Sequence, residues 1–182
     1  MANLSQIEEF LKAKQISHQI VDLGGEVLTV YQVKKTGVKE DEIVKTLIIK
    51  TNNDFIVLAV RGCDRVDFKK VRRLFGPSTS LRPSALRSST MSSDESLRLE
   101  EVNCELAKPE EVQKIVGVPI GAVCPVLIEV PLYFDRKVMS LKHVNMGSGD
   151  LTHGLEMDFS DLLKAVGEYK VEDLVLDESD VL

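Results

Sequence analysis

The sequence has few aromatic side chains and only three cysteines. Aromatic residues make up 5% of the 182 residues, which argues against a protein that binds nucleic acid mainly by stacking bases on exposed rings. The cysteines, Cys63, Cys104 and Cys124, are odd in number and far apart. Their spacing indicates neither a disulfide framework nor a zinc site with paired ligands. The three histidines form no metal-ligand pattern either, so we expect no metal and no cofactor.

Long apolar runs are also absent. The longest, such as residues 47–49 and 56–60, have the length of strands, far short of the roughly 20 residues that cross a bilayer. The first nine residues are acidic and amphipathic, without the basic-then-apolar order of a secretory signal. The sequence therefore predicts no membrane-spanning segment and a cytoplasmic location.

Charge is unevenly distributed along the chain. The formal net charge is −6, yet residues 61–98 carry nine basic side chains against four acidic ones. From Glu168 onward, six acidic side chains accompany one basic side chain, Lys170. A basic face on an acidic protein can hold a nucleic acid while the remaining surface discourages non-specific binding. The alternative is a helix face that is merely solvated.

Apolar periodicity and turn residues predict alternating helices and strands. Helices are expected at residues 5–14, 30–37, 68–75, 109–117 and 159–166, with Ser5, Thr29, Asp67 and Asp158 as N-terminal caps. Strands are expected at residues 16–23, 44–50 and 55–60, within 97–106, and around 126–130, 132–135, 144–146 and 155–157. Strands 44–50 and 55–60 flank a turn and predict a central hairpin. This order, in a chain of this length, indicates a single α/β (mixed α+β) domain on a mixed sheet.

The helix expected at residues 68–75 is strongly amphipathic. Phe68, Val71, Leu74 and Phe75 fall on one side and predict its core face. The other side is basic and consists of Lys69, Lys70, Arg72 and Arg73. Residues 77–96 follow, rich in serine and with little apolar periodicity, which predicts a loop or insertion.

Common catalytic signatures are absent from the sequence. Residues 147–149 lack the third glycine of a dinucleotide fingerprint and precede a strand-like segment. Residues 117–122 lack the lysine and hydroxyl pair of a phosphate-binding loop. No nucleophile elbow is present either.

Three other segments stand out by their order. They are Lys45 at the start of an apolar strand, a glycine-to-proline loop at residues 121–125, and a second glycine loop at residues 145–149. Together with residues 67–71 and 161–163, they resemble the YbaK/ProX family, the freestanding relatives of the editing domain inserted in bacterial prolyl-tRNA synthetases. The resemblance covers about residues 1–167, interrupted by the serine-rich stretch near 77–96, and leaves residues 168–182 as an acidic tail.

The resemblance implies a fold and an activity. The fold is a mixed, mostly antiparallel sheet or partial barrel surrounded by helices. The activity is deacylation, in trans, of a mischarged tRNA, with tRNA for proline carrying alanine or cysteine as the favoured substrate. Prolyl-tRNA synthetase is then a candidate partner. The pocket accepts the terminal adenosine and its misattached amino acid, and the ribose 2′-hydroxyl assists the attack of water.

The resemblance also implies roles for individual residues. An aminoacyl ester is already reactive, so the enzyme chiefly orients a water and stabilises an oxyanion. A lysine supplies a fixed charge, a glycine allows close approach and a proline stiffens the loop whose amides at residues 122–124 face the ester. The catalytic set is Lys45, Gly121, Ala122, Val123, Cys124 and Pro125. The substrate-binding set is Leu28, Thr46, Asn145, Gly147, Ser148 and Gly149, and the tRNA-binding set is Lys69, Lys70, Arg72 and Arg73.

Two positions depart from the family pattern. Gly154 stands where several relatives carry an aspartate, and Leu23 stands at a tyrosine position. Two other functions stay open at this point. The basic stretch is compatible with a non-catalytic tRNA- or RNA-binding module, and Cys124 with a cysteine-dependent acyl hydrolase. Spacing alone also leaves Lys45 open as a strand-end lysine that extends to solvent.

Overall fold

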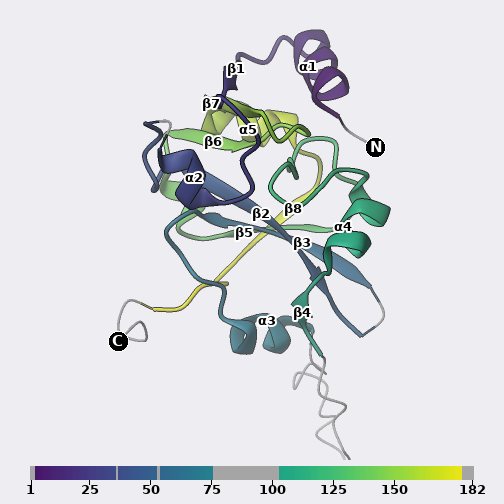
Figure 1. Ribbon diagram of the computed structural model, residues 1–182. Helices are drawn as coiled ribbons and strands as arrows, with labels where there is room; N and C mark the ends of the chain where they lie inside the picture. The colour runs from purple at the N-terminus through teal and green to yellow at the C-terminus, as the bar shows by residue number, and fades with distance from the viewer. Residues whose placement is uncertain (1–2, 36, 53, 76–102, 178–182) are drawn as a thin grey trace, which may run out of the picture.

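Two apolar strands form the centre of the structure, a computed structural model that describes residues 3–35, 37–52, 54–75 and 103–177 (Figure 1). Strands β2 (Ile43–Lys50) and β3 (Phe55–Arg61) pair in antiparallel register from Val44 opposite Arg61 to Lys50 opposite Phe55. Both faces of β3 are buried, as expected for a strand with a continuous apolar run. The predicted central hairpin is confirmed. The serine-rich stretch at 77–96 lies outside the described residues.

Around this hairpin the sheet has the order β1-β7-β6-β2-β3-β5-β8, and β4 also pairs with β2. The further strands are β1 (Gln19–Asp22), β4 (Glu105–Leu106), β5 (Leu132–Asp135), β6 (His143–Gly147), β7 (His153–Asp158) and β8 (Tyr169–Glu172). β2 runs parallel to β6, and β3 and β8 run parallel to β5, while the other pairs are antiparallel. The predicted mixed sheet is thus confirmed, and within the described residues it stays open between β1 and β8.

The helices begin and end where local chemistry favours it. They are α1 (Leu4–Ala13), α2 (Val30–Lys34), α3 (Phe68–Phe75), α4 (Pro109–Val116) and α5 (Phe159–Ala165), with a short 3-10 turn, η1 (Val138–Ser140). Thr29 caps α2 through the Gln32 N–H, and the Asp67 carboxylate accepts from the first N–H groups of α3. Both caps were predicted. The first helix is capped by Asn3, paired with Gln6, instead of Ser5.

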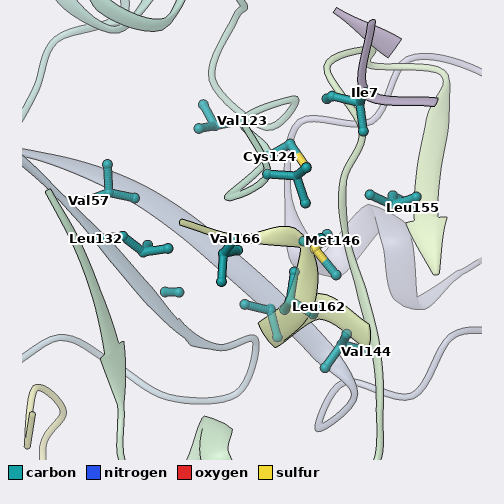
Figure 2. Close-up of a cluster of buried hydrophobic side chains, with 14 of the residues drawn as sticks. Ile7, Val57, Val123, Cys124, Leu132, Val144, Met146, Leu155, Leu162 and Val166 are labelled. Carbon is teal, nitrogen blue, oxygen red and sulfur yellow. The ribbon is translucent and has the colours of Figure 1, made fainter. Parts of the chain in front are cut away.

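The sheet separates two apolar clusters. One contains α1, α4 and α5 with Val44 and Ile48 of β2, and Figure 2 shows part of it around Met146 and Val166. The other contains Val71 of α3 with alternate residues of β3. The alternation follows from the period of a strand, whose successive side chains point to opposite faces. In α3, Val71 is fully buried, but Leu74 is exposed, contrary to its predicted core position.

Two expectations in the second half of the chain were wrong. No strand forms at residues 126–130, where Leu127 instead has a positive φ of 60°. Residues 168–177, expected to belong to an acidic tail, contribute β8 and the buried Leu174. The buried carboxylate of Asp135 accepts the Leu174 N–H at 2.8 Å and so ties this segment to β5. Acidic residues at exposed positions of the segment concealed its apolar contacts.

Strand β2 loses its partner on one side over a short stretch. β6 pairs with Ile43 and Val44, and β4 pairs with Ile49 and Lys50. Residues 45–47 lie between these two ladders, and we call them the unpaired edge of β2. This gap leaves room beside the strand in the middle of the sheet.

Gly147 allows the glycine-to-proline loop to pack directly on the end of β6. A Cβ atom at this position would lie 2.4 Å from the Val123 carbonyl oxygen and 2.8 Å from the Ala122 carbonyl carbon. Gly121, at a φ of +93°, likewise packs against the main chain of Leu28. A Cβ atom at Gly121 would lie 3.0 Å from the Leu28 Cα atom. The two glycines thus hold three segments, distant in sequence, against each other.

Gly147→Ala is therefore expected to lower the free energy of unfolding by about 1–3 kcal/mol, because backbone atoms must move to admit the methyl group. Thermal or urea denaturation measures the change. Gly167→Ala is the matched control, since a Cβ there would meet nothing within 4 Å. Equal stability of the two variants would contradict the direct packing.

Candidate functional site

A cavity of about 400 Å³ lies along the unpaired edge of β2. Its walls come from β2, from α2 and the segment before it, from the end of β4, from the glycine-to-proline loop, from the end of β6 and from the turn that leads into β7. Most wall residues are apolar. Leu28, Ile120 and Leu106 are among them and remain partly exposed, at 51%, 41% and 54%. A concave, mainly apolar site with a few polar groups is typical of small-molecule recognition.

Lys45 and the glycine-to-proline loop share this cavity, which Lys45, Gly121 and Val123 all line. Lys45 is half-buried, and its ammonium group donates to the Asp64 carbonyl oxygen at 2.5 Å. Within the described residues it forms no salt bridge, although Asp64, Cys63 and Glu40 act on it at longer range. Burial lowers the pKa of Lys45, and these neighbours oppose the shift. A lysine in this setting is a candidate anion-binding group.

The rest of the loop is mostly buried. Ala122, Cys124 and Pro125 do not line the cavity. The Ala122 N–H donates to the Pro119 carbonyl oxygen at 3.1 Å, and its own carbonyl accepts from Gly149 at 2.8 Å. The Ala122 amide is therefore already engaged. Of the residues at 122–124, only Val123 meets the cavity.

Cys124 lies inside the apolar cluster, close to Met146 and Val166 (Figure 2). Burial raises the pKa of its thiol to about 12, even though the Val126 N–H hydrogen-bonds to it. Since the thiolate is the nucleophilic form of cysteine, this environment suits a packing role.

The second glycine loop divides into cavity wall and support. Asn145 and Gly147 line the cavity, whereas Ser148 and Gly149 do not. The buried Asn145 amide donates to Glu156 at 2.8 Å, which fixes its orientation. Ser148 is fully buried, and its hydroxyl donates to the His153 carbonyl oxygen at 2.7 Å. Ser148 therefore holds the turn in place from behind.

The other predicted substrate-binding residues, Leu28 and Thr46, also line the cavity. So do the two departures from the family pattern, Leu23 and Gly154. A Cβ at Gly154 would lie 3.3 Å from the Asn145 amide nitrogen and 3.6 Å from Leu23. Because Gly154 carries no side chain, the Asn145 amide occupies this part of the wall.

Asp150 and His153 also line the cavity, and the sequence analysis did not single them out. His153 Nδ1 lies 3.3 Å from an Asp150 carboxylate oxygen and 2.8 Å from the Thr152 hydroxyl. Hydrogen bonds from the Thr152 hydroxyl and N–H lower the pKa of Asp150. In the sequence, the only signal for this pair was that Asp150 and His153 are three residues apart directly after a glycine loop. That spacing indicates contact only when the chain is known to turn there.

The basic face of α3 is separate from the cavity. No residue of α3 lines the cavity, and Val71 packs in the cluster opposite to that of Val44 and Ile48. In Figure 1, α3 is near the bottom and α2 at the upper left. Lys69, Arg72 and Arg73 are exposed. Lys70 instead contacts Asp173 at 2.9 Å, Asp177 at 3.2 Å and the Val175 carbonyl oxygen at 2.8 Å. Three of the four residues thus present an accessible charge.

Two further searches cover only the part of the chain that the structure describes. There, no helix combines the length and apolar character that a membrane crossing requires. In the same residues, no group of three or more histidine, cysteine, aspartate or glutamate side chains is arranged to hold a metal ion.

Comparison with curated proteins finds proline–tRNA ligases. The one from Caldicellulosiruptor bescii is 27% identical over 112 residues, and the one from Staphylococcus aureus strain Newman is 28% identical over 111 residues. These alignments cover 62% and 60% of this chain but 15% of each ligase. The chain thus corresponds to a small part of the relatives it matches.

Solved structures of similar fold match nearly the whole chain. The hypothetical protein APE2540 is 27% identical with a TM-score of 0.69, and the match covers 93% of this chain and 99% of that one. A candidate trans-editing enzyme for prolyl tRNA synthetase has a TM-score of 0.71 at 21% identity, covering 96% and 97%. At that identity the second likeness supports the fold.

A family model gives the decisive comparison. The model for the aminoacyl-tRNA editing domain matches residues 26–88 and 96–165, well over half of the chain. These ranges include Lys45, both glycine loops and the cavity walls from α2 to β7. The resemblance drawn from the sequence is confirmed: the chain belongs to the aminoacyl-tRNA editing domain family.

Proposed function

We propose that this chain hydrolyses the ester bond of a mischarged aminoacyl-tRNA, and that its substrate is tRNA for proline carrying alanine or cysteine. The observation that carries the proposal is the shared cavity, in which the half-buried Lys45 and the loop residues Gly121 and Val123 border the same space. The family of the chain and its similarity to part of two proline–tRNA ligases support the choice of substrate.

The proposed chemistry needs little from side chains. An aminoacyl ester is activated toward water, so catalysis requires orientation of the ester and stabilisation of the developing oxyanion. Lys45, which lines the cavity, supplies a positive charge for the terminal phosphate or the ester oxygen, once its ammonium leaves the Asp64 carbonyl. Gly121 and Val123 are the loop residues that line the cavity.

The apolar walls favour a small side chain on the substrate. Val27, Val44 and Met146 surround the space without offering a charge, so an alanine methyl or a cysteine thiol loses little by entering. Discrimination against larger residues would then rest on volume. The Asn145 amide beside Gly154 adds a polar group to this wall.

The alternative of a cysteine-dependent hydrolase loses its support. Cys124 is buried away from the cavity, and burial raises the pKa of its thiol to about 12. The alternative of a non-catalytic binding module does not explain a mainly apolar cavity lined by Lys45. Turnover of a mischarged tRNA would remove that alternative.

Lys45→Ala is expected to reduce kcat/KM for deacylation by about 100-fold, because one well-placed electrostatic contact to a developing oxyanion has this effect. The measurement is release of amino acid from a panel of tRNAs charged with alanine, cysteine, serine or proline. Lys164→Met, at an exposed lysine on α5, is the matched control. Equal rates for wild type and Lys45→Ala, or no release from any tRNA, would reject the proposed activity.

The burial of Lys45 has a separate consequence for stability. Its pKa in the folded protein lies below the ordinary 10.5, so between these two values the unfolded chain binds more protons than the folded one. The free energy of unfolding of the wild type should therefore rise with pH across that window. Lys45→Met removes this contribution. Urea denaturation at pH 7 to 11 should show the variant losing stability relative to the wild type as pH rises, and a constant difference would contradict the lowered pKa.

For tRNA contact we propose Lys69, Arg72 and Arg73 of α3, the accessible members of the basic face. Reversing all three charges to glutamate should weaken tRNA binding and lower the slope of log affinity against log salt by about three. Hydrolysis of a minimal aminoacyl-adenosine should be unchanged, because no residue of α3 lines the cavity. A parallel loss of both activities would contradict this division of roles.

A further inference from the structure

The unpaired edge of β2 turns main-chain groups toward the cavity. Pairing of β6 ends at Val44, and pairing of β4 begins at Ile49, with the Ala107 N–H bonded to the Ile48 carbonyl oxygen at 2.9 Å. Thr46 is the central residue of the stretch between them. No other strand covers it on that side in the described part of the chain.

The alternation of hydrogen bonds along the central hairpin determines the direction of the Thr46 main-chain N–H and C=O groups. The Gly62 N–H bonds to the Ile43 carbonyl at 2.7 Å, and the Thr51 N–H bonds to the Asp54 carbonyl at 2.8 Å. In an antiparallel pair, alternate residues exchange both bonds with the partner. The main-chain N–H and C=O groups of the odd-numbered residues of β2 therefore point toward β3. The N–H and C=O of Thr46 face the other way, toward the cavity that Thr46 lines.

The Thr46 side chain adds an independent observation. Its hydroxyl oxygen is buried and has no hydrogen-bond partner among the described residues. A buried hydroxyl without a partner is unfavourable, and valine would fill nearly the same volume without that penalty. Packing alone therefore does not account for a threonine at this position. In the described part of the chain, Thr46 thus presents a hydroxyl without a partner and an N–H and C=O that neither neighbouring ladder pairs, beside walls that are otherwise mostly apolar.

We propose that the aminoacyl group of the substrate pairs with Thr46 as a one-residue antiparallel strand. The α-ammonium group donates to the Thr46 carbonyl oxygen, and the Thr46 N–H donates to the carbonyl oxygen of the ester. An amino acid carries these two groups at the spacing of the N–H and C=O of one strand residue, which is the arrangement of a hydrogen-bonded antiparallel pair. The pairing rests on the proposed function and specifies what that site recognises.

Three properties of the substrate follow from this pairing. The substrate must carry a free α-ammonium group: a deaminated analogue lacks the donor, and an N-acylated analogue keeps an N–H but loses the charge that strengthens the contact. It must be an L-amino acid, because the hand of the α-carbon determines on which face of the sheet its side chain lies. The Thr46 N–H also contacts the ester oxygen on which negative charge develops, so the same contact strengthens in the transition state.

Amide hydrogen exchange on the ¹⁵N-labelled full chain tests the pairing directly. In the free protein, the Thr46 amide should exchange at least about tenfold faster than those of Lys45 and Leu47, which bond to β3 and serve as matched internal controls. Addition of 3′-deoxy-3′-(L-alanylamino)adenosine, which has an amide in place of the ester, should slow Thr46 exchange by a similar factor and leave the two controls unchanged. Protection of Thr46 in the free protein, or no change on addition, overturns the proposal.

Calorimetry with four analogues of this compound gives a second test. The L-alanyl analogue should bind about 10- to 100-fold more tightly than three others, as expected for a hydrogen bond to a charged group. These are the propionyl analogue, which lacks the donor, the N-acetyl-L-alanyl analogue, which keeps an N–H without the charge, and the D-alanyl analogue, which directs its methyl group to the opposite face of the sheet. Thr46→Val should keep this order of affinities, because the contacts are to the main chain. Equal affinities, no binding of the L-alanyl analogue, or loss of the order in Thr46→Val each overturns the pairing.

The two proposals fail in different ways. Binding and protection in the expected pattern without hydrolysis of the corresponding ester would reject the deacylase activity and keep the pairing. Hydrolysis of L-alanyl and N-acetyl-L-alanyl esters by the same factor over their spontaneous rates would keep the activity and reject the pairing.

Discussion

The site depends on one steric constraint, the contact of Gly147 with the main chain of Ala122 and Val123. Where any side chain would lie within 3 Å of backbone atoms, glycine lets a loop rest directly on the end of β6. The Ala122 carbonyl then accepts from the Gly149 N–H, which fastens the two glycine loops together. With the loop in this place, Gly121 abuts the main chain of Leu28 and the segment leading to α2. The cavity is the space that these contacts and the gap in β2 leave between them.

A second constraint concerns charge. Lys45 is half-buried with a single hydrogen bond to a main-chain carbonyl and no salt bridge within the described ranges. Around it, Arg61 and Asp64 satisfy each other through two hydrogen bonds of 2.7 and 3.1 Å. The nearby acid is thus largely committed to another partner, and the lysine stays available for an anion from outside. The arrangement sacrifices some stability, because burial disfavours the charged ammonium.

Much of the fold could be predicted from the sequence, namely those elements in which the apolar pattern and the capping or turn residues indicate the same structure. The central hairpin, α3 after Asp67 and α4 between Pro109 and Gly117 combine apolar periodicity with caps and turns, and all three were predicted correctly. β8 was missed because two of its four residues are charged and none is fully buried, and because it pairs in parallel with β5, which is distant in sequence. Residues 126–130 look like a strand, yet Val126 packs in the core from an irregular segment.

The candidate site could be predicted from the sequence only in part. The motif order singled out Lys45, Gly121 and Asn145, and all of them line one cavity. It did not reveal that Ala122 and Ser148 serve as support, nor that Asp150 and His153 reach the cavity, because a turn of the chain determines both. The unpaired edge of β2 is invisible in sequence, since it arises where two other strands stop.

The late position of β8 has a consequence for synthesis of the chain. The cluster beneath α3 is closed by Leu174 and Val175, and the Asp67 N–H bonds to the Leu174 carbonyl oxygen across more than half of the chain. While the protein emerges from the ribosome, β3 and α3 therefore keep apolar surface exposed until residues 174 and 175 have been translated. Such a nascent chain is a natural client for chaperones that shield unfinished sheets.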